Sequence, residues 1–213
     1  GWAESTKQLP QRKHRELLAS SHLRSGTALT DVMLISSRDG LHFDVWPESF
    51  IRPGPQRPGS WFYGDNFPAR GIVETKSHLE GAPNELSFYA SEAYRQPNGS
   101  RLRRYTLRID GFVSIRAPLT GGQVVTKPII FDGKQLEINF STSAAGYVGV
   151  EIQDAAGKPI PGFSAKDGTK YEGVDELRLT PTWKTPLSTL KGSVVRLRFH
   201  LRNAKIYSFE ICK

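Results

Sequence analysis

The sequence predicts an all-β protein, in which an antiparallel, jelly-roll-like β-sandwich follows one or two smaller β-sheets. Short runs of alternating apolar and polar residues recur from about residue 105 to the end of the chain. Turn signals separate these runs about every 8–12 residues, a spacing that is typical of sandwiches. Hydrophobic residues make up 38% of the 213 residues, which is the composition of a globular protein with a sizeable core.

The chain divides into three parts by its pattern of polar and apolar residues. Residues 1–26 are polar and basic, contain no apolar run like that of a signal peptide, and favour at most a short helix around residues 11–20. Residues 27–104 hold several strand candidates and an irregular stretch. Residues 105–213 are regularly β-patterned, and we expect the sandwich there.

Within residues 27–104, the segments DVMLISS and LHFDVW flank Asp39-Gly40, which predicts a two-residue type I′ hairpin because both central residues of that turn need positive φ. Residues 47–71 are rich in proline, glycine and aromatic residues. A long irregular loop of this kind is more often functional than idle. The segments GIVETKS and ELSFYASEAY predict two further strands.

In the sandwich region, Asp110-Gly111 and Asp132-Gly133 predict two more hairpins. Apolar residues then alternate with polar ones in two stretches, which predicts strands with one buried face. The apolar positions are Leu136, Ile138 and Phe140 in the first stretch and Val195, Leu197, Phe199 and Leu201 in the second.

Composition limits the classes of partner. A net charge of +8 permits acidic partners, but the basic residues are scattered and form no known nucleic-acid-binding motif, so we expect no nucleic acid. No apolar run approaches the roughly 18–20 residues of a membrane span, so we expect no membrane partner. The single cysteine, Cys212, excludes an intrachain disulfide, and the histidines lack metal-ligand spacing, so we expect neither a metal nor a cofactor.

Ser37, Asp39, Gly40 and Phe43 form an S-x-D-G-x-x-F motif, which is similar to the Asp-box hairpin of β-propeller glycosidases. The resemblance implies that Asp39 caps its own turn, away from any chemistry. A wider resemblance, to the C-terminal part of bacterial putative glycosyl hydrolases of the invertase/levanase–arabinanase superfamily, spans most of the chain. The stretches that carry it include SRDGLHFDVWPESFIRPG, GIVET, ELSFYASEAY, RLRRYTLRIDGFVSIRAPLTGGQVVTKPI and VVRLRFHLRNAKIYSFEI.

That family has a five-bladed propeller, which carries the active site, followed by a β-sandwich. The resemblance therefore implies that residues 27–104 form a partial propeller-like region, since a blade takes about 40–50 residues. No N-D-P-N-G motif, which holds the family's nucleophile, is present. The catalytic candidates are Glu74, which is expected to be buried on an inner strand, and Asp65 in the loop.

A typical signature of sugar binding is a set of flat aromatic rings that stack on the sugar, with planar polar groups beside them. The residues around the 47–71 loop supply both, and Trp183 is a second possible platform. The predicted ligand-binding residues are Trp46, Trp61, Tyr63, Asn66 and Arg70.

The sequence thus predicts a glycosyl hydrolase-like fragment that binds or helps to process a poly- or oligosaccharide and lacks complete catalytic machinery. Two alternatives stay open: a non-catalytic carbohydrate-binding module, and a structural domain that forms homo-oligomers through exposed sheet edges. The resemblance implies a secreted or periplasmic location.

Overall fold

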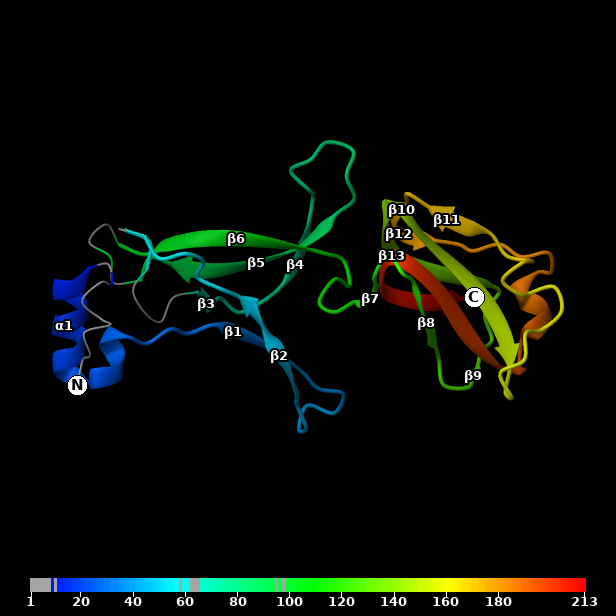
Figure 1. The fold of residues 1–213 in the computed structure, drawn as a ribbon, viewed down its shortest axis with the longest axis horizontal. Helices are drawn as coiled ribbons and strands as arrows, with labels where there is room; N and C mark the ends of the chain where they lie inside the picture. Colours follow the sequence, from blue (N-terminus) through cyan, green and yellow to red (C-terminus); the bar gives the residue numbers. More distant parts are fainter. Residues whose placement is uncertain (1–8, 10, 58, 62–65, 95, 97–98) are drawn as a thin grey trace. The chain divides into compact units, whose positions relative to one another are not determined.

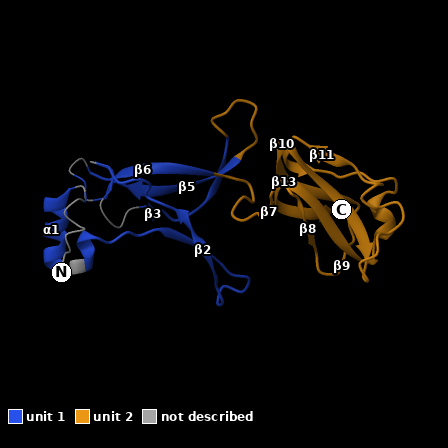
Figure 2. Ribbon diagram, in the orientation of Figure 1, with its two compact units in different colours: residues 1–76, 85–106 blue, residues 77–84, 107–213 orange. Residues whose placement is uncertain are grey.

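The computed structural model describes residues 9, 11–57, 59–61, 66–94, 96 and 99–213 (Figure 1). These residues fold mainly into antiparallel β-strands, which confirms the predicted all-β class. The chain divides into two compact units (Figure 2). Unit 1 comprises residues 1–76 and 85–106, and unit 2 comprises residues 77–84 and 107–213.

Unit 1 begins with helix α1 (Arg12–Ser21), which confirms the short helix expected there, and the 3-10 turn η2 (Leu23–Gly26). Leu18 is buried on α1. Arg15 is buried too, and its Nη1 donates to the carbonyl oxygen of Gly26 at 2.8 Å. The guanidinium therefore joins the helix to η2, because a buried charge needs such a partner.

Strands β1 (Val32–Ser36) and β2 (Asp44–Ile51) form a separate two-stranded antiparallel sheet. The predicted two-residue hairpin is wrong, because the last pair is Ser36 with Asp44 and residues 37–43 form the connection. Asp39 nevertheless caps this loop. Its Oδ1 accepts from the backbone N–H of His42 at 2.8 Å and of Leu41 at 2.9 Å. The hydrogen bond from the His42 backbone is the main reason that the pKa of Asp39 lies well below its usual range.

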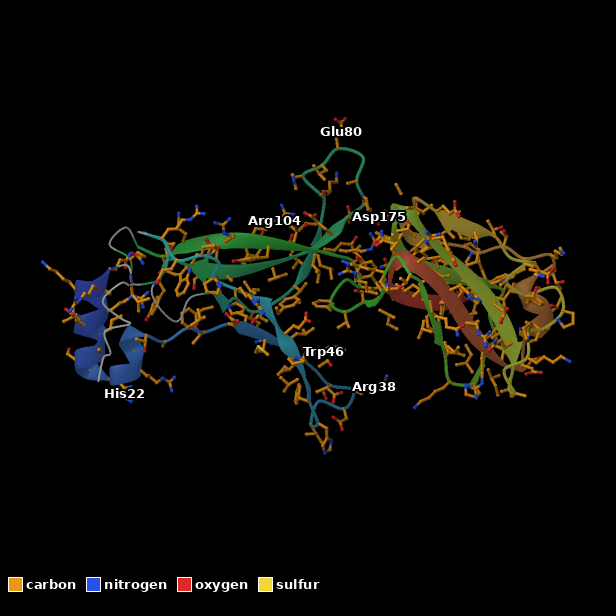
Figure 3. All side chains as sticks on the ribbon, in the orientation of Figure 1. His22, Arg38, Trp46, Glu80, Arg104 and Asp175 are labelled. Carbon is orange, nitrogen blue, oxygen red and sulfur yellow. The ribbon has the colours of Figure 1, made fainter. Side chains whose placement is uncertain are left out.

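The second sheet of unit 1 is built on β5 (Glu85–Glu92). Strands β3 (Phe67–Pro68) and β4 (Val73–Thr75) pair with successive stretches of β5, and β6 (Arg101–Arg108) also pairs with it. Arg104 of β6, labelled in Figure 3, donates to Ser87 at 2.8 Å, to Thr75 at 2.9 Å and to Glu85 at 2.8 Å. This guanidinium cross-links three strands. The described residues of this region form open sheets and no closed propeller.

Unit 2 is a sandwich-like sheet built on two long central strands, β10 (Gln135–Asp154) and β13 (Val194–Cys212). They pair antiparallel from Gln135 with Cys212 to Asp154 with Val195. The shorter strands pair with one or other of these two. Those on β13 are β7 (Ile115–Ala117), β8 (Gly122–Val125) and β9 (Ile129–Ile130), and those on β10 are β11 (Lys170–Glu172) and β12 (Asp175–Leu179).

The long strands bend so that their two halves enclose one core. Phe199 and Phe209 both lie on β13, and about ten residues of straight strand would separate them by about 33 Å. Their ring centroids are only 5.4 Å apart. Phe140 of β10 likewise lies 6.3 Å from the ring of Tyr171 on β11, which pairs with the far half of β10. The two halves therefore face each other as layers, while the jelly-roll order of the strands stays a prediction.

The alternation predicted for the core is confirmed, because all seven of the predicted apolar positions on β10 and β13 are buried. Strand β13 runs without a break through residues 202–205, RNAK.

The two other Asp-Gly hairpins are wrong. Asp110-Gly111 follows β6 and leads into β7, which belongs to a different sheet. Asp132-Gly133 lies between β9 and β10, but β9 pairs with β13 and not with β10. Gly133 has another reason to be glycine, since a Cβ there would lie 2.3 Å from the carbonyl oxygen of Cys212.

Candidate functional site

The predicted catalytic residues do not form a buried carboxyl pair among the described residues. Glu74 lies on β4 opposite Leu86, and it is exposed, so its expected burial is wrong. Strand β4 is an outer strand of its sheet, not the inner strand that the sequence suggested. Asp65 and Tyr63 lie outside the described residues.

The described aromatic candidates are held by local hydrogen bonds. The indole N–H of Trp46 donates to Ser36 at 3.1 Å across the β1–β2 pair, where Figure 3 labels the side chain. The indole N–H of Trp61 donates to the carbonyl oxygen of Gly54 at 3.0 Å. Arg70 is exposed. These contacts give both indoles a role in fixing their own segments.

Asn66 differs from the other candidates because it is only 3% exposed. Its Oδ1 lies 3.4 Å from the hydroxyl of Tyr105, which also donates to Glu92 at 2.9 Å. A hydroxyl has a single proton, so the nearer carboxylate takes it. Burial raises the pKa of Glu92, but its hydrogen bonds from Arg103 and Tyr105 outweigh that effect and lower it. This cluster is a structural network at the end of β5.

A groove that the sequence did not reveal lies on the sandwich where β10 and β13 bend. We call it the corner groove. Its volume is about 310 Å³. Its lining residues come from β7, β10 and β13: Arg116, Ser141, Thr142, Ser143, Asn203, Ala204 and Lys205.

Strand register places the groove's polar side chains side by side. Ser141 of β10 pairs with Lys205 of β13, and Lys205 pairs with Arg116 of β7. Neighbouring strands are about 4.8 Å apart, and directly opposed residues point to the same face. The side chains of Ser141, Lys205 and Arg116 therefore form one row across three strands.

A break in the β10–β13 ladder opens the groove. Pairing passes from Thr142 with Ala204 to Tyr147 with Arg202, so residues 143–146 stand opposite Asn203 alone. Asn203 has φ of 39°, a left-handed conformation that asparagine tolerates better than most residues.

The backbone around Asn203 is fixed from both sides. Its Nδ2 donates to Ser143 at 2.6 Å, and its backbone N–H donates to the carbonyl oxygen of Pro118 at 2.9 Å. Gly146 passes so close that a Cβ there would lie 2.4 Å from the Asn203 carbonyl oxygen. The bend is therefore a built feature of the sandwich, and so is the depression that it creates.

The electrostatics of the groove are one-sided. In the part of the chain that the structure describes, the side chains of Arg116 and Lys205 make no hydrogen bond and no ion pair. The carboxylate next along the row is Asp175 on β12, which pairs with Ser141 and is labelled in Figure 3. Arg108 already forms an ion pair with Asp175.

Arg108 is itself held in place beside Asp175 by several contacts. The Arg108 Nε donates to Asn139 at 2.6 Å, and its Nη2 donates to the carbonyl oxygen of Glu176 at 2.6 Å. Its guanidinium carbon also lies 4.9 Å from the ring centroid of Tyr207. The groove thus keeps two cations without a protein counter-ion.

A second cavity, of about 190 Å³, lies beside Trp183. The indole N–H of Trp183 donates to the carbonyl oxygen of Val150 at 2.9 Å, and its ring packs 5.9 Å from that of Phe163. The hydrogen bond ties the indole to β10, so Trp183 covers the sandwich edge instead of offering a free stacking platform.

The sequence signal for the corner groove was weak. The run STSAAG breaks the alternation of β10 with small and hydroxyl residues, and RNAK interrupts that of β13. Neither run shows which strands become neighbours. Of the residues that the structure describes, no group of three or more His, Cys, Asp or Glu is placed to hold a metal ion. None of the described helices is long and apolar enough to cross a membrane.

Comparison with family models, with curated proteins and with solved structures gave no match to this chain.

Proposed function

We propose that this chain is a carbohydrate-binding protein that holds an oligo- or polysaccharide in the corner groove of its sandwich. The observation that carries the proposal is the polar lining of that groove. Three hydroxyl residues and an asparagine line this space of about 310 Å³: Ser141, Thr142, Ser143 and Asn203. The Thr142 hydroxyl is bonded to the backbone of Val174 and the Ser143 hydroxyl to Asn203, so Ser141 is the serine whose hydroxyl we expect to meet the sugar first. This volume is at the lower end of the range for small-molecule sites, about 300–1,000 Å³.

The lining suits sugar hydroxyls better than nucleobases. Hydroxyl and amide groups both donate and accept, as the hydroxyls of a sugar do. Single-stranded nucleic acids instead rely on aromatic side chains on which the bases stack, and the lining contains none. The stacking rings expected from the sequence are therefore not part of this groove, and a saccharide would be held there by hydrogen bonds to its hydroxyl groups.

Binding without hydrolysis is the activity that we propose. Hydrolysis of a glycosidic bond needs two carboxyl groups, about 5–5.5 Å apart in retaining enzymes and about 6.5–9.5 Å apart in inverting ones. The groove lining has no carboxyl group, and Glu74 is exposed on a different unit. The resemblance to glycosyl hydrolases would then concern the sandwich, as a module that retains a saccharide.

The test is a thermal-shift and calorimetric screen of the full chain against neutral and acidic oligosaccharides. A ligand at about 100 times its dissociation constant stabilises a protein by about 2.7 kcal/mol, which gives a measurable rise in melting temperature. Ser141→Val removes a hydroxyl from the groove and should abolish the shift. Ser193→Val, in the exposed turn before β13 and outside the groove lining, is the control and should leave the shift intact. A shift that Ser141→Val does not change would place the sugar elsewhere.

A second candidate function, self-association, is favoured by the β1–β2 sheet. Apolar side chains on and beside it are exposed, among them Leu41 at 81%, Val45 at 63% and Ile35 at 53%. A two-stranded sheet has unpaired edges that another strand can extend. Sedimentation over a range of concentrations tests this function, and Ile35→Lys should dissociate any dimer. A monomer at all concentrations would exclude it.

A further inference from the structure

We propose that the ligand of the corner groove carries a negatively charged group, a sulfate ester or a carboxylate, which Arg116 and Lys205 bind together. This inference rests on the proposed function, since it names the class of saccharide for the same groove. It predicts that acidic polysaccharides bind and that their neutral counterparts bind weakly.

The corner groove places two like charges opposite each other. Arg116 and Lys205 are directly opposed residues of neighbouring antiparallel strands. Like charges in this arrangement repel each other and destabilise the pair. An anion between the two side chains would replace that repulsion by two attractions.

Three arginines elsewhere in the chain are already engaged by carboxylates. Arg103, Arg104 and Arg108 each have a carboxylate partner: Glu92, Glu85 and Asp175 respectively. The side chains of Arg116 and Lys205 have none among the described residues. These two cations are therefore available to a ligand without breaking an existing ion pair.

The chemistry of the two side chains also suits an anionic group. A guanidinium offers a planar fork of N–H donors that matches the two oxygens of a carboxylate or sulfate. The lysine ammonium adds a compact second charge from the neighbouring strand. The Ser141 hydroxyl, next in the same row, can donate to a third oxygen of the group or to an adjacent sugar hydroxyl.

The test compares binding of the full chain to dextran sulfate, to unsulfated dextran and to alginate oligosaccharides by calorimetry at several salt concentrations. Arg116→Gln and Lys205→Gln should each weaken binding of the acidic saccharides at least tenfold. Each should also reduce the dependence of log K on log salt concentration by about one unit, since each removes one neutralised charge. Lys127→Gln removes an exposed lysine between β8 and β9, and as the matched control it should change neither quantity.

Polyacrylate, single-stranded DNA and inorganic sulfate separate the failure of this inference from that of the proposed function. Equal binding of dextran and dextran sulfate, unaffected by the two substitutions, would overturn the charged ligand and leave carbohydrate binding standing. If polyacrylate and DNA bound as tightly as dextran sulfate and the variants lost this binding, the groove would bind polyanions in general, and the proposal of a saccharide ligand would fail. If millimolar inorganic sulfate saturated the groove and displaced dextran sulfate, the groove would be a site for a free anion and not for a saccharide. Binding of dextran sulfate and alginate alone, lost in both variants, would support the proposal.

Discussion

Asn203 gives the sharpest test of the bend in the sandwich, because its backbone has a φ of 39°. The left-handed conformation costs a residue with a Cβ about 1–2 kcal/mol, and the cost is smaller for asparagine than for most residues. Replacement by alanine brings the full left-handed cost in place of the smaller cost for asparagine, and it also loses the hydrogen bond to Ser143, which contributes about 0.5–1.5 kcal/mol. We therefore expect Asn203→Ala to lower the free energy of unfolding by about 2 kcal/mol.

Asn203→Gly loses the same hydrogen bond but removes the strain, so we expect it to be about 1 kcal/mol more stable than the alanine variant. This order is the reverse of the usual one within a strand, where glycine is less stable than alanine by about 0.5–1 kcal/mol. Glu210, an exposed residue of β13 without a positive φ, is the control site and should show the usual order.

Urea unfolding, combined with hydrogen exchange of the β10 and β13 peptides, measures both pairs of variants and assigns the change to unit 2. Equal slopes of free energy against urea concentration are needed for the comparison. If Asn203→Ala were as stable as Asn203→Gly, the left-handed backbone would not constrain this position, and our account of the bend would fail.

Three further predictions concern unit 2. Burial lowers the pKa of His200 below its ordinary value near 6.5, so the unfolded chain binds more protons than the folded one as pH falls below that value. The free energy of unfolding should therefore fall between pH 7 and pH 5, and His200→Gln should flatten this pH dependence in thermal unfolding. If the pH dependence of the variant were the same as that of the original protein, His200 would not be its cause. Arg108→Gln should lower the free energy of unfolding by about 3 kcal/mol in urea, because it removes charged donors from Asn139 and two backbone carbonyls; a loss below about 1 kcal/mol would refute this role. Gly146→Ala should cost about 2 kcal/mol, since its Cβ would lie 2.4 Å from a backbone oxygen. Gly149→Ala is the control, because its Cβ would meet only a lysine Cγ at 3.7 Å, and it should hardly change the free energy of unfolding. Calorimetric unfolding of both variants measures the two free energies.

The core could be predicted from the sequence because burial on a strand has a period of two. Val195, Leu197, Phe199 and Leu201 follow this period, and all four are buried. The pattern depends only on the strand itself and on which of its faces is apolar. Partner strands are not needed for that inference, and so it succeeded.

Asp-Gly dipeptides were misread because turn chemistry is local and strand pairing is not. Asp110 has a φ of 57°, so the chain does turn there with the positive φ that the dipeptide favours. The strand before this turn pairs in one sheet and the strand after it pairs in another. A local signal gave the conformation of the residue correctly and could not give its partners.

The corner groove could not be predicted for the same reason. Arg116, Ser141 and Lys205 are far apart in the sequence and become neighbours only through the register of β7, β10 and β13. A one-residue slip of β13 would turn Lys205 towards the core and abolish the row. By contrast, the candidates from the 47–71 loop rested on their closeness in the sequence, which left their geometry open.

The pairing of β13 with so many partners also governs how this protein reaches its folded state. Ala117 must find Ala204, and Ile130 must find Val194, before β7 and β9 have any ladder. Each such closure loses chain entropy long before burial compensates for it, so domains of this kind fold in milliseconds to seconds instead of microseconds. During that interval β10 exposes an apolar row to other chains. High temperature and high protein concentration should therefore reduce the refolding yield of this protein by aggregation before they affect the native state itself.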